Sequence, residues 1–518
     1  MRRILLIFIF CTSLLADKKP NILFILADDL GYGDLSCYND EAKVKTANLD
    51  QLANEGMRFT DAHSPSTVCT PSRYSIMTGR MAFRLNFKGV FTGVSGPCLI
   101  TKDRLTLPQM LRNNGYETAM FGKWHIGMSF LDKNGDVIEV SEPPRKTPKL
   151  KKQEIALEAI KRVDYSKPIP DGPLNQGFDH FFGTVCCPTS DWLYAYIDGD
   201  RIPVPPTKIV DKALLPKHFW SFDCRAGLLA PNFKHENVDM VFLEKSLSFL
   251  DSHHKKQSAK PFFLFHSLQA VHLPSFPAKE FQGKTQAGPH GDFIYQFDYI
   301  VGKLVEKLKT LGMAENTLVI ISSDNGPEVG TTINMRERYK HNGARPWRGV
   351  KRDNWEGGHR VPMIAWWPGK IRSSSVSQQT VCLTDIMATC ASIVNTSLPN
   401  NAAEDSFNIL PILLGQTTKA IREFTLHQTI SLDLSIRHGD WKYLDHSGSG
   451  GNNYSGGRIK KALGLTNSKI NAPAQLYNLK ADPKEVNNLY YQHPEIAQQL
   501  KAKLEEFKTS GRSAPKRN

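Results

Sequence analysis

The sequence lacks the marks of several protein classes. After residue 15 it has no apolar run long enough to cross a membrane, which takes about 20 residues. It shows no internal repeat, no low-complexity segment, no recognisable DNA- or RNA-binding motif and no zinc-finger spacing. Cysteine is sparse, with 9 residues in 518, so a small scaffold held by disulfides is excluded. We therefore expect no membrane span and no nucleic-acid partner.

The first 16 residues have the pattern of a secretory signal peptide. Arg2 and Arg3 precede an apolar run over residues 4–15, and Ala16 stands where cleavage is expected. The run is too short to span a bilayer. We therefore predict that 1–16 is a signal peptide and that the mature protein is periplasmic or secreted.

Length and charge limit the organisation and the partners. The 518 residues suit a large domain with a smaller one. The composition shifts near Ile421, which predicts a catalytic domain over 17–420 and a C-terminal subdomain over 421–518. The formal net charge of +14 favours a polyanionic partner, such as a sulfated glycan, a nucleic acid or an anionic surface. The lack of a nucleic-acid-binding motif makes a nucleic acid the weaker of these options.

Four continuous apolar runs predict strands buried on both faces of a sheet. Polar residues follow each run: 21–26 precedes Asp28 and Asp29, 118–121 precedes Lys123 and His125, 261–265 precedes His272, and 317–322 precedes Asp324 and Asn325. Ligands of open α/β sheets bind outside the carboxyl ends of the strands. We therefore expect the four clusters to converge at one edge. Helical spacing predicts helices over 237–250 and 295–311, among others.

The two acidic clusters predict a metal site. Asp28, Asp29, Asp324 and Asn325 offer only hard oxygen ligands. Such ligands suit calcium or magnesium and argue against zinc or copper. The alternative is that each cluster forms a turn or a helix cap.

One short stretch combines a nucleophile with a place for an anion. It begins at Cys69, has Pro71 where a first helical turn tolerates proline, and continues through Arg73 to a stop at Gly79. A helix N-terminus at Cys69 would attract an anion, and Arg73 would share its face. The alternative is an ordinary buried cysteine.

The sequence Cys-x-Pro-x-Arg at 69–73, followed by Thr78-Gly79, resembles the signature of the formylglycine-dependent type I sulfatases, arylsulfatase-like members of the alkaline phosphatase superfamily. Gly-Lys-Trp-His at 122–125 and Trp-Glu-Gly-Gly at 355–358 strengthen the resemblance. It implies an α/β sandwich with a large mixed central sheet flanked by helices. It also implies a smaller C-terminal α+β subdomain with an antiparallel sheet.

The resemblance further implies two non-standard components. A formylglycine-generating or anaerobic sulfatase-maturating enzyme would convert Cys69 to formylglycine (3-oxoalanine). Calcium, in preference to magnesium, would be bound by residue 69 together with Asp28, Asp29, Asp324 and Asn325. The hydrated formylglycine, a gem-diol, would then attack the sulfur of the ester.

The remaining site residues receive their expected roles from the same resemblance. Arg73 would hold the formylglycine, and His125 would pair with its second hydroxyl. Lys123 and Lys351 would bind the sulfate oxygens, although isolated lysines are usually solvated. His272 would protonate the leaving oxygen, and His266 is the competing choice for that role.

We therefore expect a sulfuric ester hydrolase acting on a sulfated carbohydrate or an aryl sulfate. One rival is a phosphomonoesterase or phosphonate monoester hydrolase of the same superfamily. Another is a secreted glycan-binding protein whose cysteine is never converted. Two segments remain outside the resemblance. The first, residues 183–192 with Cys186 and Cys187, matches no family motif. The second is the lysine-rich insert around 145–152, which we expect to be a solvated surface.

Overall fold

The computed structural model describes residues 18–517, except 141–147, 219–220, 222, 456 and 466–470. The predicted signal peptide lies outside these residues. Among the helices described, none combines the length and apolar character that a membrane crossing requires.

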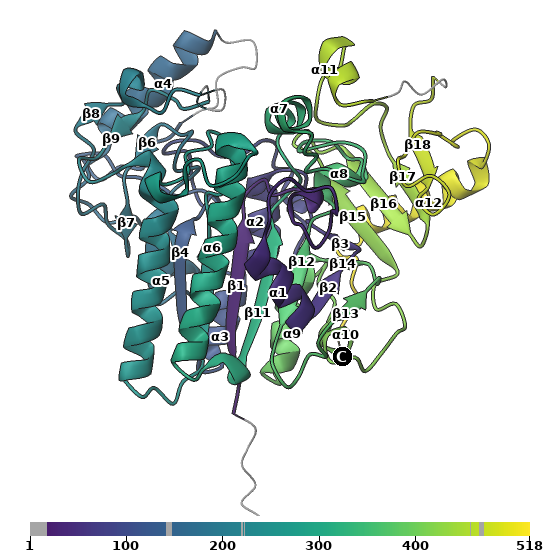
Figure 1. Ribbon diagram of the computed structural model, residues 1–518, viewed down its shortest axis with the longest axis horizontal. Coiled ribbons are helices and arrows are strands. Elements are labelled where there is room, and N and C mark those ends of the chain that lie inside the picture. Colours follow the sequence, from purple (N-terminus) through teal and green to yellow (C-terminus); the bar gives the residue numbers. More distant parts are fainter. Residues whose placement is uncertain are drawn as a thin grey trace, which may run out of the picture.

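A nine-stranded sheet forms the centre of the molecule, in the order β13-β2-β12-β11-β1-β10-β4-β5-β7 (Figure 1). Its middle strands are β1 (Asn21–Ala27), β10 (Phe262–Ser267), β11 (Thr317–Ser323) and β4 (Glu117–Lys123). They run parallel to one another. All of β1, β10 and β11 is buried, which is why their sequences are continuously apolar rather than alternating.

The outer strands make the sheet mixed. On one side β5 (His180–Thr184) is parallel to β4 and antiparallel to β7 (Ile197–Asp198). On the other side β12 (Met363–Trp366) is antiparallel to β11 and to β2 (Met57–Phe59), and β13 (Ser375–Ser377) closes the edge. The predicted large mixed sheet is confirmed.

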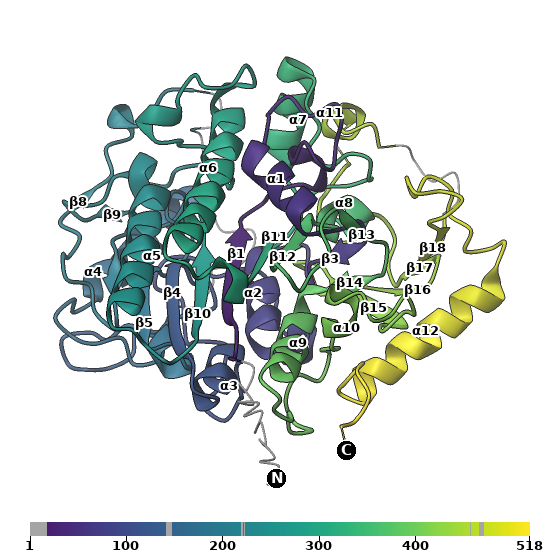
Figure 2. The same ribbon diagram turned by 60° about the horizontal axis from the view of Figure 1, so that its bottom comes forward.

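Helices cover both faces of this sheet. One group contains α1 (Ala47–Glu55), α5 (Val238–Lys255) and α6 (Gly288–Thr310), and the other contains α2 (Cys69–Thr78), α3 (Leu107–Asn113) and α9 (Ile386–Ile393) (Figure 2). The layers therefore form the expected α/β sandwich.

A second sheet lies beside the first and has its own small core. It consists of the antiparallel strands β15 (Phe424–Gln428), β16 (Leu434–His438), β17 (Trp441–Leu444) and β18 (Gln475–Asn478). Helix α12 (Pro494–Thr509) packs on it through Leu500 and Leu504. The smaller antiparallel sheet agrees with the predicted fold class, while the division at residue 421 stays a prediction.

The remaining elements connect these layers. They are β3 (Ala62–His63), β14 (Val381–Cys382), β6 (Leu193–Tyr194), β8 (Lys208–Ile209), β9 (Leu228–Leu229), α4 (Lys149–Arg162), α7 (Val329–Tyr339), α8 (Glu356–His359), α10 (Leu410–Leu413) and α11 (Gly457–Ala462). Helix α6 begins at Gly288, earlier than the predicted residue 295, because a proline in its first turn favours a helix start there. The prediction missed this turn because His290 and Asp292 are buried polar residues that interrupt the apolar pattern.

Candidate active site

The four central strands end side by side at one edge of the sheet, and their following residues meet there. Strand β1 leads to Asp28 and Asp29, β11 to Asp324 and Asn325, β4 to Lys123 and His125, and β10 to His272. Cys69 and Arg73 come from α2, and Lys351 from the loop after α7. All ten residues are buried, with at most 8% of the surface of any one residue exposed. The structure thus brings these ten predicted residues together at one edge, whereas the alternative His266 lies elsewhere.

Four oxygen-bearing side chains form the acidic part of the site. Asp29 has a left-handed backbone (φ 61°) and accepts a hydrogen bond from Asn325 Nδ2 at 2.7 Å, while its N–H donates to Asp324 Oδ1 at 3.3 Å. Two buried oxygens, Asp29 Oδ2 and Asn325 Oδ1, have no hydrogen-bond partner among the described residues. Burial and the charge of Asp28 raise the pKa of Asp324 to about 6. Unsatisfied buried acceptors and crowded carboxylates are costly, so these residues fit a divalent cation with a preference for oxygen.

Arg73 fixes the geometry of the carboxylates. Its Nε donates to Asp324 Oδ2 at 2.9 Å, and its Nη2 lies 3.4 Å from Asp28 Oδ2. Its Nη1 donates to Ser267 Oγ at 2.6 Å and to the Lys123 carbonyl at 3.0 Å. The guanidinium thereby joins α2 to the ends of all four central strands, a role that its fixed, forked donors suit.

Two lysines supply further positive charge. Lys123 Nζ forms an ion pair with Asp28, and Lys351 Nζ donates to Asp29 Oδ1 at 2.6 Å. Burial acts to raise the pKa of Asp28, but the charges of Lys123 and His272 outweigh it and lower that pKa to about 2. Burial opposes charge on both lysines, but the carboxylates of Asp28 and Asp29 raise the pKa of Lys123 and Lys351, respectively. Both ammonium groups therefore remain charged in a buried site, where their bonds to an anion are strong.

Cys69 is the first residue of α2. Val68 before it is extended (φ −149°, ψ 157°), and Gly79 ends the helix in the left-handed conformation that the sequence predicted. The thiol lies 3.8 Å from Asp28 Oδ1. The pKa of the Cys69 thiol is raised, mainly by a side-chain hydrogen bond with Cys187 and secondly by burial. An unmodified cysteine here is therefore a poor source of thiolate.

His272 is placed to donate a proton. Its Nε2 lies 3.8 Å from Asp29 Oδ2 and 3.7 Å from Cys187 Sγ, and its Nδ1 contacts the Leu273 carbonyl. Burial opposes a charged ring, but the negative charges of Cys187 and the nearby aspartates raise the pKa of His272 to about 9. The ring is therefore protonated at neutral pH.

His125 has the opposite tendency. Its backbone is left-handed (φ 58°), and its Nε2 lies 2.8 Å from the Phe91 carbonyl, so this nitrogen carries the hydrogen. Burial and the charge of Lys123 lower the pKa of His125. Its Nδ1 contacts Cys187 Sγ at 4.0 Å. A neutral and a charged imidazole at one site can serve as base and acid.

His266, the competitor of His272, lies elsewhere. It belongs to β10 itself, and its Nδ1 is 2.8 Å from Ser246 Oγ on α5. Burial lowers its pKa to about 3. The predicted strand stopped at residue 265, whereas β10 continues to Ser267 and carries His266 into the core.

Sequence reasoning missed Cys187 as part of the site. It follows β5, which lies parallel to β4, so its strand also ends at the functional edge. The sequence carries no signal of this position, because such short segments do not encode the pairing of β5 with β4. The sequence also carries no signal that the Phe91 carbonyl orients His125, because every residue has a backbone carbonyl.

The layered fold and this edge, with its carboxylates, paired lysines and helix-borne cysteine, define a hydrolase of the alkaline-phosphatase-like superfamily. Residues 20–396 match the family model described as Sulfatase. The chain belongs to the Sulfatase family, whose members are sulfuric ester hydrolases.

Named relatives cover nearly the whole chain. It is 32% identical over 510 residues to N-acetylgalactosamine-6-O-sulfatase of Bacteroides thetaiotaomicron, covering 95% of this chain and 94% of that one. It is 30% identical over 524 residues to human arylsulfatase A, covering 96% and 89%. A solved structure from work on the metabolism of multiple glycosaminoglycans by Bacteroides thetaiotaomicron superposes with a TM-score of 0.78 at 30% identity, covering 95% of this chain and all of that one.

Proposed function

We propose that this protein removes sulfate from a sulfated carbohydrate, with a formylglycine formed from Cys69 as the nucleophile and with bound calcium. The observation that carries the proposal is the meeting of the α2 N-terminus with four oxygen ligands, two buried lysines and a protonated histidine at one edge. The net charge of +14 and the carbohydrate sulfatase among the relatives favour a sulfated glycan over a small aryl sulfate.

Asp28, Asp29, Asp324 and Asn325 would hold the calcium, because they supply only hard oxygens and two of these oxygens are buried without a hydrogen bond from any described residue. Calcium, when bound, supplies Lewis-acid stabilisation of negative charge on an oxygen of residue 69. Formylglycine, when hydrated, supplies two hydroxyls on one carbon. One would attack the sulfur, and deprotonation of the other would expel sulfate and re-form the aldehyde. The host would need a formylglycine-generating or anaerobic sulfatase-maturating enzyme.

The side chains of this chain have separable tasks in the proposed reaction. Lys123 and Lys351 would bind the sulfate oxygens through charge-assisted hydrogen bonds, which a dry site strengthens as charge develops. Arg73 would keep Asp28 and Asp324 in place through the contacts that it already makes.

Two histidines would move the protons. His272, protonated at neutral pH, would give its proton to the oxygen of the leaving alcohol. His125 would accept a proton from residue 69 at Nδ1, because its other nitrogen is held by the Phe91 carbonyl.

The modification can be tested directly by the intact mass of the peptide that contains residue 69. Formylglycine would lower the mass by about 18 Da relative to cysteine. We expect converted enzyme to hydrolyse 4-nitrophenyl sulfate and the variant Cys69→Ala to be inactive. An active enzyme with unmodified Cys69 would contradict the proposal.

The rival activities can be separated with matched esters. We expect kcat/KM for 4-nitrophenyl sulfate to exceed the values for 4-nitrophenyl phosphate and a phenylphosphonate ester. Saccharides carrying N-acetylgalactosamine 6-sulfate are the first carbohydrate substrates to compare with 4-sulfated isomers, because of the named relative. A protein whose Cys69 stays unconverted, and which binds sulfated saccharides as tightly as its Cys69→Ala variant while releasing no sulfate, would support the non-catalytic rival.

We also propose that residues 1–16 direct the chain to the periplasm or out of the cell, and that 17–420 and 421–518 are its catalytic domain and C-terminal subdomain. The secretory pattern of the N-terminus supports the first proposal. The separate sheet β15–β18 and its own core support the second.

A further inference from the structure

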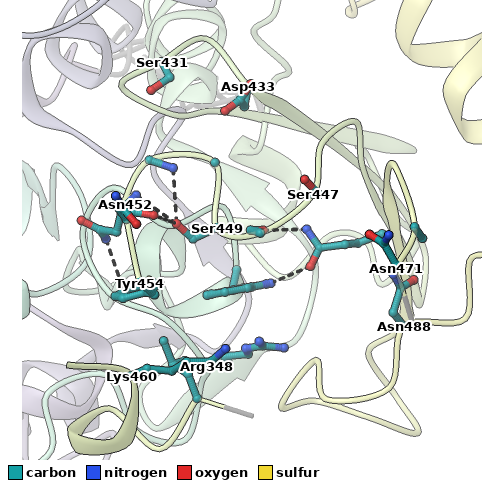
Figure 3. A pocket seen from close by; sticks show the side chains of 18 residues that line it. Arg348, Ser431, Asp433, Ser447, Ser449, Asn452, Tyr454, Lys460, Asn471 and Asn488 are labelled. Atoms are coloured by element: carbon teal, nitrogen blue, oxygen red, sulfur yellow. Dashed lines mark hydrogen bonds between the residues drawn. The ribbon is translucent and has the colours of Figure 1, made fainter. Parts of the chain in front are cut away.

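A cavity of about 620 Å³ lies between the C-terminal subdomain and the loop that follows α7 (Figure 3). Its inner wall is rigid. Gln475 Oε1 accepts from Trp355 Nε1 at 3.2 Å, while Gln475 Nε2 donates to the Gly448 carbonyl at 2.7 Å. Ser449 and Asn452 close a hydrogen-bonded loop on the other side. The shape of this cavity is therefore fixed by the protein itself.

The lining has the chemistry of a sugar site. The rings of Trp355 and Tyr454 stack with an interplanar angle of 13°, which provides an aromatic wall. Polar side chains line the rest, and several of them form no hydrogen bond or ion pair with any described residue: Ser431, Asp433, Ser447, Lys460 and Asn471. Hydroxyl, amide, carboxylate and ammonium groups together can donate to and accept from the hydroxyls of a sugar.

A second cavity of about 410 Å³ adjoins the first and shares Arg348 and Leu465 with it. Its charged lining residues are Arg336, Arg345, Arg348 and Lys484, with no Asp or Glu among the described residues that line it. Arg345 is paired with Glu41.

Two of these cations are uncompensated. Arg336 and Lys484 form no ion pair with any residue in the described part of the chain. Burial lowers the pKa of Arg336 more than the charge of the neighbouring Glu337 raises it, so this partly desolvated cation is not fully balanced by a carboxylate. Such an arrangement suits an anionic ligand.

The two cavities lie close to the proposed active site. Asn452 Nδ2, from the loop that walls the first cavity, donates to the Lys351 carbonyl at 2.8 Å. Its Oδ1 accepts from Arg352 Nε at 2.9 Å. In Figure 1, α7 and α11, which carry Arg336 and Lys460, lie at the end of the molecule toward which β1 and β11 point. A long, chain-like ligand bound at the active site could therefore extend over this surface.

We propose that the two adjoining cavities bind a remote part of a sulfated glycan, the first holding a sugar residue and the second one of its sulfate groups. Only the choice of a sulfated glycan as ligand rests on the function proposed above. The site makes no contribution to the reacting sulfate and would act on the affinity for long substrates.

The test compares two charge-matched double variants. Arg336→Glu with Lys484→Glu reverses the second cavity, and Lys102→Glu with Lys419→Glu makes the same change in net charge at exposed positions on other surfaces. Both are made in the Cys69→Ala protein, and binding of a hexasaccharide containing N-acetylgalactosamine 6-sulfate is measured by calorimetry. We expect Kd to rise about tenfold or more in the cavity variant, equivalent to roughly 1.4 kcal/mol, and by less than about twofold in the control.

The contrary results are equally definite. Equal weakening of both variants would mean a general charge effect, and no weakening of the cavity variant would mean no site; either overturns the proposal. Inorganic sulfate binding as tightly as the hexasaccharide would assign a simple anion site instead. If the charge reversal prevents folding, Arg336→Gln with Lys484→Gln is compared with Lys102→Gln and Lys419→Gln.

Turnover by the converted enzyme separates this proposal from the function itself. With Cys69 present, the cavity variant should show a raised KM for the hexasaccharide and unchanged kcat/KM for 4-nitrophenyl sulfate. Failure of the parent enzyme to hydrolyse either ester would contradict the proposed function. The binding comparison in the Cys69→Ala protein would still decide whether the cavities bind the glycan.

Discussion

The two histidines at the active edge differ in what surrounds them. His272 faces Asp29 and Cys187, which favour its charged form, whereas His125 faces Lys123, which favours its neutral form. Each therefore rests in the protonation state that its proposed role needs, and neither role requires the site to reorganise. The same contrast makes the two roles separable by mutation.

The variant His272→Ala should lose activity in proportion to the basicity of the leaving group. General acids contribute about 10²–10⁴-fold, so we expect a loss of this size in kcat for a carbohydrate sulfate. The loss for 4-nitrophenyl sulfate should be much smaller, because nitrophenolate leaves without a proton. Measuring kcat on both substrates checks this. His266→Gln, a change in the core away from the site, should leave the ratio of the two rates unchanged, and an equal loss on both substrates for His272→Ala would contradict the role.

Calcium should stabilise the folded protein through oxygens that now have no partner. A ligand present at 100 times its Kd stabilises by about 2.7 kcal/mol, so Tm should rise as calcium is added to chelator-treated enzyme. Asn325→Ala removes one unpartnered oxygen without altering the balance of charge among the carboxylates and lysines. It should reduce this Tm shift, whereas Asn134→Ala, at an exposed turn, should retain it. An undiminished shift in Asn325→Ala would place the ion elsewhere.

The strand ends were predictable because buried parallel strands are continuously apolar and then stop. This pattern in residues 21–26 and 317–322 predicted strands β1 and β11. It also indicated Asp28 and Asp324, because these residues follow the two strands directly. Cys187 was not predictable, because its place depends on β5 lying next to β4, a pairing that short segments do not encode. The orientation of His125 depends on a carbonyl, and carbonyls leave no trace in a sequence.

Strand β4 reaches the site only because Gly122 has no side chain. Its φ is 125°, and a Cβ there would lie 1.7 Å from the Ser267 carbonyl oxygen of β10. Gly122→Ala must separate the two strands at the point that places Lys123 and the Ser267 hydroxyl. We expect destabilisation beyond the roughly 1–3 kcal/mol of backbone strain alone, together with a loss of kcat/KM. Thermal unfolding and assay with 4-nitrophenyl sulfate measure the two effects.

Gly115 gives the matched control. It also has a positive φ, 91°, but a Cβ there would meet nothing within 4 Å. Gly115→Ala should therefore show the strain and keep full activity. Equal Tm loss in the two variants, with activity retained in both, would show that close approach of β4 and β10 is not what positions Lys123.

Buried charges join the four-stranded C-terminal sheet to the layers around the nine-stranded sheet. Lys442 of β17 lies 2.9 Å from Glu356 and 3.0 Å from Glu485, and it contacts His359 Nε2 at 3.0 Å. Arg437 of β16 pairs with Asp61 at 2.8 Å. Charged side chains default to the surface in sequence reasoning, so this junction could not be foreseen. It binds the C-terminal sheet to the catalytic layers through groups that tolerate no loss of a partner.

Three fully buried histidines complete the junction in their neutral form. Lys442 donates to His359 Nε2, so His359 must give its single hydrogen to His63 Nδ1 at 3.0 Å, and His63 gives its own to Asp61 at 2.8 Å. His427 stacks on His359 with ring centroids 3.7 Å apart. Burial lowers the pKa of all three rings, because an added proton has nowhere favourable to go.

The junction should therefore weaken in acid. A histidine whose pKa is depressed on folding contributes stability that is complete above its unfolded pKa of about 6.5 and is lost as the pH falls below it, at about 1.4 kcal/mol per pH unit for each ring. Glu485, whose pKa burial raises to about 7, titrates with the opposite sign, so the difference between variants is the proper measure. The stability advantage of the parent over His427→Gln should shrink by about 1 kcal/mol between pH 6.5 and 5.5 in denaturant unfolding, because the unfolded ring is already half protonated at pH 6.5. Ile436→Val destabilises the same sheet without removing a titratable group, so its difference from the parent should stay constant. A constant difference for His427→Gln as well would mean that the buried rings do not make the joint between the sheets sensitive to acid.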